Sequence, residues 1–298
     1  MNISQAQPYH QPVLVGEVLS GLAVRPGGHY VDCTMGDGGH SVAILDASAP
    51  NGLLLGLDID PEALAVSRER LAGYGQAATI LHFSYAKLNL IAQNSGFLPA
   101  DGILLDLGIS SRQVDLESRG FSFQSQDSLD MRFDSDGDLT AADLVNHSDE
   151  KELADIIYRF GEETRSRRIA KAIVACRPIQ TAGELAEIVR RSAGYPRGRT
   201  HPATRVFQAL RIAVNDELGN LAQGLEQAAE VLVRGGRLVT IAYHSLEDRL
   251  IKQSITGKVD SLVGKFKPIT KKVVRPSAEE VRQNRRSRSA KLRVAERT

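Results

Sequence analysis

The 298-residue sequence contains no tryptophan and only two cysteines, Cys33 and Cys176, which lie far apart. Without a CxxC spacing they provide neither a disulfide framework nor a zinc site, and they suit a thiol-reducing compartment. The chain also lacks an apolar run long enough to cross a bilayer, and residues 1–12 lack the charged and apolar regions of a signal peptide. We therefore expect a soluble, cytoplasmic protein with no membrane contact and no bound metal.

The chain has little net charge, +1, but that charge is distributed unevenly. Residues 127–155 hold ten acids against two bases, a net of −8, whereas residues 190–211 hold six arginines and no acid. Residues 281–298 hold seven bases against Glu296, a net of +6. Such runs are often only solvated faces, but two arginine-dense segments are also what a surface that binds RNA requires.

Short apolar runs alternate with helical patterns in the N-terminal third of the chain, which is typical of a parallel sheet covered by helices. The predicted strands are residues 29–33, 53–57, 78–82, 102–105 and 237–242. The predicted helices are residues 62–71, opened by Pro61, and residues 85–93 and 215–233. This pattern predicts an α/β fold.

The alternation stops between residues 107 and 214, where helical stretches such as 141–160 and 164–176 occur without a strand pattern. Because a helix and a strand follow, we expect an all-helical domain, residues 111–211, inserted into one α/β domain made of residues 1–110 and 212–298. Recognition of the substrate is the role that we expect of the insertion.

A glycine-rich turn at Gly36, Gly38 and Gly39 follows the first predicted strand. Glycines let the backbone wrap a ligand closely, and the start of the next helix offers free N–H groups to an anion. A dinucleotide-binding fingerprint would need a third glycine where Ser41 stands. We expect the ligand to lie against this loop, so that a side chain at Gly38 would fill its space.

Three carboxylates, those of Asp32, Asp58 and Asp106, follow predicted strands at the edge where open α/β sheets bind ligands. Asp58, 22 residues beyond Gly36, suits the ribose hydroxyls that NAD and S-adenosyl-L-methionine share. Three carboxylates would repel a pyrophosphate but attract a sulfonium and an ammonium. The residues therefore favour S-adenosyl-L-methionine, and the alternative that these aspartates only cap helices and turns stays open.

Longer motifs follow one another along the chain: HQPVL from His10, GGHS from Gly38, DGILLDLGISS from Asp101, RGFSF from Arg119, LDMR from Leu129, HPATR from His201, FQALR from Phe207, HSLEDR from His244 and RSAKLR from Arg288. With this set the sequence resembles the bacterial small-subunit ribosomal RNA cytosine-N4-methyltransferases, the MraW or RsmH family. The resemblance implies a Rossmann-like class I methyltransferase fold and N4-methylation of a specific cytidine in 16S ribosomal RNA. The expected partner is that RNA or the 30S particle, and monomer and homodimer both stay open.

The resemblance also implies roles for residues around the cofactor. Those expected to contact S-adenosyl-L-methionine are Gly38, Gly39, His40, Asp58, Tyr85, Asp106 and Gln113. The family commonly has phenylalanine at the position of Tyr85, and the alignment there is ambiguous by one or two residues, so Phe83 is a rival.

Methyl transfer to an exocyclic amine needs alignment and an acceptor for the amine hydrogens. DNA amino-methyltransferases supply it with an Asp/Asn/Ser-Pro-Pro-aromatic turn, but the turn here, residues 106–110, lacks the prolines and the aromatic. We expect the acceptor to be Asp106, a backbone carbonyl or His244. His244 has the alternative role of a structural residue before a helix capped by Ser245.

Arg197, Arg199 and Arg205 are candidates for contact with RNA phosphates, because guanidinium groups match phosphate oxygens. Arg165 is a weaker candidate, since Glu162 and Glu163 stand beside it. Two other classes of function stay open. A nicotinamide-dependent oxidoreductase would share the sheet, and a non-catalytic RNA-binding ribosome-assembly factor would need the arginines alone.

Overall fold

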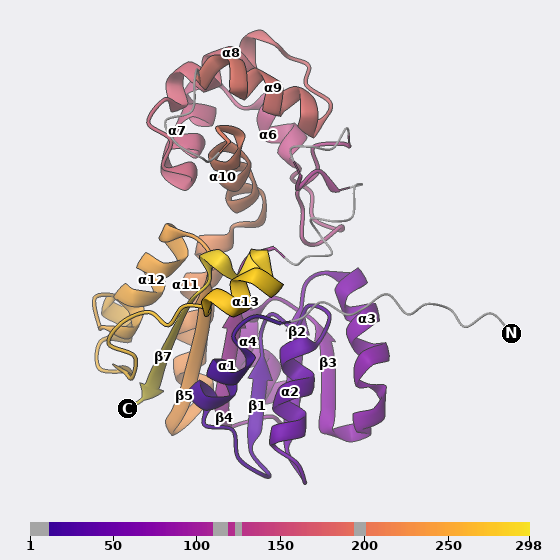
Figure 1. The fold of residues 1–298 in the computed structure, drawn as a ribbon, viewed down its shortest axis with the longest axis vertical. Helices are drawn as coiled ribbons and strands as arrows, with labels where there is room; N and C mark the ends of the chain where they lie inside the picture. The colour runs from indigo at the N-terminus through magenta and orange to yellow at the C-terminus, as the bar shows by residue number, and fades with distance from the viewer. Residues whose placement is uncertain (1–11, 110–118, 123–126, 194–200) are drawn as a thin grey trace, which may run out of the picture. The chain divides into compact units, whose positions relative to one another are not determined.

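The computed structural model describes residues 12–109, 119–122, 127–193 and 201–298. The chain forms two compact units, one of residues 1–108 and 219–298 and the other of residues 109–218 (Figure 1). In the described ranges, no helix combines the length and the apolar character that a membrane span needs.

The first unit contains a seven-stranded sheet in the order β3-β2-β1-β4-β5-β7-β6. Its parallel strands are β1 (His29–Asp32), β2 (Leu53–Asp58), β3 (Ala78–His82), β4 (Ala100–Asp106) and β5 (Leu232–Ala242). The antiparallel strands are β7 (Lys291–Arg297) and β6 (Phe266–Pro268). This arrangement is the Rossmann-like class I methyltransferase fold, so the predicted fold class is confirmed.

Helices cover both faces of this sheet because its central strands are apolar on both sides. Successive residues point to opposite faces, so Val31 packs with α4, α11 and α12 while Tyr30 packs with α1 and α2. The helices of this unit are α1 (Val15–Leu22), α2 (Gly39–Ala47), α3 (Pro61–Leu71), α4 (Leu88–Asn94), α11 (Glu217–Val231), α12 (Ser245–Ile255) and α13 (Ala278–Gln283). Since the five parallel strands run in one direction, their carboxyl ends meet at one edge, the carboxyl edge.

Local signals explain where several helices begin. The Asp60 side chain accepts a hydrogen bond from the Glu62 N–H at 3.1 Å, and Pro61 stands in the first turn of α3, as predicted. The helix predicted for residues 85–93 begins instead as a 3-10 turn, Tyr85–Lys87, and continues as α4. Strand β6 was not predicted, because three residues carry too little pattern.

The second unit contains helices and no named strand in the residues that the structure describes, and residues 127–140 are irregular. Its helices are α6 (Ala141–His147), α7 (Glu150–Gly161), α8 (Ser166–Ala175), α9 (Ala182–Ala193) and α10 (Ala203–Asn215), packed around their own apolar core. The single helical stretch predicted for residues 141–160 is wrong. It is two helices, because the Asp149 side chain accepts from the Glu152 N–H at 2.7 Å and starts a second one.

The contact between α7 and α10 depends on a glycine. A Cβ atom at Gly161 would lie 2.5 Å from the backbone oxygen of Arg205, which cannot move without displacing α10. We expect Gly161→Ala to lower the free energy of unfolding of the second unit by about 1–3 kcal/mol, a typical cost of overpacking.

The matched control is Gly16→Ala in α1, where a Cβ atom meets nothing within 4 Å. It should leave stability unchanged or raise it by up to about 1 kcal/mol, because alanine favours a helix. Urea denaturation followed by circular dichroism measures both variants. Equal stability of Gly161→Ala and wild type would contradict this account of the packing.

Candidate active site

The loop after β1 is held by the buried carboxylate of Asp32. It accepts hydrogen bonds from the Ser41 hydroxyl at 2.7 Å and from the Thr34 N–H at 3.2 Å. Burial raises the pKa of this carboxyl group. Asp32 therefore joins the end of β1 to the start of α2, which is an internal role.

The glycines of the loop serve its backbone conformation. Gly36 and Gly38 have φ values of +52° and +76°, a backbone conformation that residues with a Cβ atom rarely adopt. A Cβ atom at Gly38 would lie 2.7 Å from Leu71 Cδ1, so it would meet α3. A side chain at Gly38 would therefore first meet α3, and the expectation that it would fill the ligand's space stays a prediction. At Gly36, by contrast, a Cβ atom would meet nothing within 4 Å.

Asp58 at the end of β2 connects that strand to the glycine loop. Its Oδ2 accepts from the Gly36 N–H at 2.7 Å, and its Oδ1 accepts from the Asp60 N–H at 2.9 Å. Burial of the carboxyl group raises its pKa to about 6. Asp58 thus fixes the loop, and its carboxyl group is mostly ionised at physiological pH, although less completely than an exposed aspartate.

Asp106 at the end of β4 is the centre of a second group of polar side chains. The Tyr243 hydroxyl donates to its Oδ1 at 3.0 Å, and the Thr34 hydroxyl accepts from its backbone N–H at 2.7 Å. Burial and the Asp106 carboxylate raise the pKa of Tyr243 well above its usual value, so the phenol keeps its proton. Tyr243 also packs against Gly108, where a Cβ atom would lie 3.0 Å from its ring.

His40 in the first turn of α2 lies beside the same carboxylate. Its Nε2 is 3.3 Å from Asp106 Oδ2, without the geometry of a hydrogen bond. Both ring nitrogens are buried, and neither has a hydrogen-bond partner among the described residues. Buried polar atoms of this kind call for a hydrogen-bond partner beyond the residues that the structure describes.

The two aromatic candidates after β3 differ in their surroundings. Tyr85 packs against the core of the first unit, and a Cβ atom at Gly224 of α11 would lie 2.5 Å from its ring. Phe83 is 49% exposed, and its N–H donates to the Asp58 carbonyl at 3.0 Å. Tyr85 is therefore held by packing, whereas Phe83 is exposed beside Asp58, and the contact of either ring with the cofactor stays a prediction.

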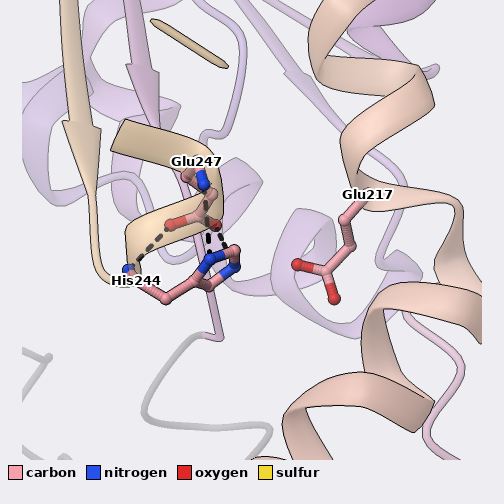
Figure 2. Close-up of side chains that lie close together, drawn as sticks. All are labelled: Glu217, His244 and Glu247. Carbon is pink, nitrogen blue, oxygen red and sulfur yellow. Dashed lines mark hydrogen bonds and ion pairs between the residues drawn. The ribbon is translucent and has the colours of Figure 1, made fainter. Parts of the chain in front are cut away.

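His244 after β5 is the N-cap of α12, so the prediction that Ser245 caps this helix is wrong. Figure 2 shows its ring against Glu247: Nδ1 accepts from the Glu247 N–H at 3.3 Å, and Nε2 lies 3.2 Å from Glu247 Oε1. Because Nδ1 is an acceptor, the proton of the neutral ring is assigned to Nε2. Such a ring cannot accept a hydrogen bond from an amine, so this geometry favours the structural role.

The predicted phosphate contacts lie in the second unit or outside the described residues. Arg205 Nη1 donates to the Glu162 carbonyl at 3.3 Å and lies 3.7 Å from Glu163 Oε2, although the side chain remains 54% exposed. Arg165 Nε lies 3.1 Å from Glu163 Oε1, so it forms the ion pair that made it the weaker candidate for a phosphate contact. Gln113, Arg197 and Arg199 are outside the described residues.

Sequence reasoning missed Thr34 and Tyr243, which hold Asp106. A signal for Tyr243 was present, because it directly follows a predicted strand and so must lie at the carboxyl edge. The predicted site residue was instead its neighbour His244, which begins the HSLEDR motif.

Comparison with known proteins places the chain in a family. The model of the MraW methylase family matches residues 7–298. A protein from Thermomicrobium roseum named ribosomal RNA small subunit methyltransferase H is 50% identical over 304 residues, which cover 97% of this chain and 93% of the relative. A protein of the same name from Coprothermobacter proteolyticus is 50% identical over 288 residues, with 96% and 95% covered. With a match over nearly its whole length, this chain belongs to the MraW methylase family.

Proposed function

We propose that this chain transfers a methyl group from S-adenosyl-L-methionine to the exocyclic N4 of a cytidine in small-subunit ribosomal RNA. The observation that carries the proposal is the family match over residues 7–298, with relatives of that name half identical to the chain. The same match argues against a nicotinamide-dependent oxidoreductase and against a non-catalytic assembly factor. The proposed target is RNA within the 30S particle.

The residues at the carboxyl edge fit this cofactor. The carboxylates of Asp58 and Asp106 attract a sulfonium and an ammonium, and the buried Nδ1 of His40, which has no hydrogen-bond partner among the described residues, suits the methionine carboxylate. The loop backbone is open at Gly36. When bound, S-adenosyl-L-methionine supplies a methyl group on a positively charged sulfur.

We assign the remaining cofactor contacts by position. Gly38, Gly39 and His40 would hold the methionine end, and Asp58 the ribose hydroxyls. Phe83 replaces Tyr85 as the aromatic residue for the adenine, because it is exposed next to Asp58. Ring stacking on an exposed phenylalanine needs no rearrangement of the core.

Asp106 is the residue that we assign to the amine. Its Oδ1 is held by the Tyr243 hydroxyl, so the carboxylate has a fixed direction. An acceptor for the N4 hydrogens favours the pyramidal amine as attack begins, and alignment supplies much of the acceleration. His244 is the weaker assignment, because its acceptor nitrogen already binds the Glu247 N–H.

Nucleoside analysis tests the proposed function. Small ribosomal subunits from a strain that lacks the gene are incubated with the protein and methyl-labelled S-adenosyl-L-methionine, and the RNA is digested to nucleosides for mass spectrometry. The expected product is N4-methylcytidine, at about one labelled nucleoside per small subunit. Label on ring carbon or ribose, or no label, would contradict the proposal.

Binding of the cofactor should depend on the protonation of Asp58. Its pKa of about 6 means that it is ionised above this pH, and only the ionised carboxylate accepts hydrogen bonds on both oxygens. We therefore expect calorimetric affinity for S-adenosylhomocysteine to be highest above pH 6 and to fall as the pH drops through that value. Asp58→Asn should lose about ten- to a hundredfold in affinity at neutral pH, together with this pH dependence. An unchanged pH profile in a folded Asp58→Asn protein would contradict the assignment.

Tyr243→Phe removes the hydrogen bond that fixes the direction of the Asp106 carboxylate. We expect kcat to fall by about tenfold, which corresponds to the free energy of one hydrogen bond to a charged group. Cofactor affinity and stability should change little, because the ring and its packing are kept. Tyr74→Phe is a matched control, since its hydroxyl donates to Asp46 at 2.7 Å on the surface of the same unit. If both variants methylate small subunits at the wild-type rate, Tyr243 does not position Asp106.

A further inference from the structure

The connection from β6 to β7 carries a concentration of positive charge. Residues 271–288, the basic segment, contain seven bases and two acids, a net of +5 in a chain whose total is +1. The bases are Lys271, Lys272, Arg275, Arg282, Arg285, Arg286 and Arg288, and the acids are Glu279 and Glu280. The charge is therefore a local feature of this segment.

The two glutamates leave most of these bases without a paired carboxylate. Glu279 pairs with Arg282, and Glu280 Oε1 accepts a hydrogen bond from the Leu14 N–H at 2.7 Å. Five of the other bases are exposed and have no carboxylate within 4.0 Å in the part of the chain that the structure describes: Lys271, Lys272, Arg275, Arg285 and Arg288. They are available to an anion.

The basic segment is fixed to the sheet, unlike a loose charged tail. Val274 and Leu292 of β7 exchange two backbone hydrogen bonds of 2.9 Å. Ser287, between the exposed Arg286 and Arg288, is fully buried, and its hydroxyl donates to the Asn284 carbonyl at 2.7 Å. A partner that binds here meets arginines whose backbone is already ordered, which lowers the entropic cost of binding.

The basic segment is also joined to the cofactor loop. Glu280 of α13 accepts a hydrogen bond from the N–H of Leu14, the N-cap of α1. Both helices are labelled in Figure 1. Two residues earlier, Pro12 packs on the loop, where a Cβ atom at Gly39 would lie 3.0 Å from its ring. A short stretch of chain thus connects the basic segment with the site of methyl transfer, and all of these residues belong to the first unit.

We propose that the basic segment binds phosphates of the substrate RNA next to the nucleotide to be methylated. This inference rests on the proposed function. A base that undergoes chemistry must leave its stack, and guanidinium groups that hold the flanking backbone keep it in place. The segment's position beside the cofactor loop favours RNA over an anionic membrane, which would bring lipid to the site.

The test compares two double variants that remove the same charge. Arg285→Gln/Arg288→Gln changes the basic segment. Arg68→Gln/Arg234→Gln changes two arginines of the same unit that are exposed in α3 and at the start of β5. Affinity for fluorescently labelled small-subunit ribosomal RNA is measured by anisotropy across a salt series, and affinity for S-adenosylhomocysteine by calorimetry.

We expect the first variant to bind the RNA at least about tenfold more weakly at low salt, and the slope of log affinity against log salt to become shallower by about 1.4–1.8 for two lost phosphate contacts. Its cofactor affinity should stay at the wild-type value. The control should keep RNA affinity and slope, and Arg285→Lys/Arg288→Lys should keep most of the slope, because the charges remain.

RNA binding by the first variant equal to that of the control would overturn the inference. Loss of binding to vesicles of anionic phospholipid, with RNA binding retained, would also overturn it and identify a lipid site. Failure of the wild-type protein to methylate small subunits would instead overturn the proposed function, so the two failures are distinguishable.

Discussion

A hydrogen bond of 2.7 Å from the Gly36 N–H to Asp58 joins the glycine loop to the neighbouring strand, and the geometry of the site depends on it. It holds Gly36 at positive φ with its backbone open, and the loop then delivers His40 to the first turn of α2 beside Asp106. This arrangement buries the Asp58 carboxyl group, which disfavours its ionised form and raises its pKa to about 6. A ligand with a positive charge and hydroxyl donors would stabilise the ionised form of this buried carboxyl group.

The separation of charge within the first unit matches a reaction with a cationic cofactor and an anionic substrate. Carboxylates of Asp32, Asp58 and Asp106 stand at the ends of adjacent strands, whereas the basic segment is attached at the start of α1. The chain's total charge of +1 conceals this division. Interactions over these short distances are less screened by salt than those across the protein surface.

Much of the sheet could be predicted, because buried strands such as β2 and β4 are nearly continuous apolar runs. The edge strand β3, which is only partly buried, was predicted to the residue from its own short apolar run. The ends of those strands then located Asp58 and Asp106. Side-chain contacts could not be predicted in this way: the hydroxyl of Tyr243 on Asp106, and the direction of a Cβ atom at Gly38, depend on packing between distant segments. Phe83 and Tyr85 are two residues apart, and only the fold distinguishes the exposed ring from the packed one.

The central claim is that the carboxyl edge of the first unit is the cofactor site, and a crystal structure with S-adenosylhomocysteine tests it most directly. The account predicts ribose hydroxyls on the Asp58 carboxylate, the adenine against Phe83 and a polar group of the ligand on the buried nitrogens of His40. A ligand bound at this edge without contact to Asp58, or bound elsewhere on the chain, would contradict it.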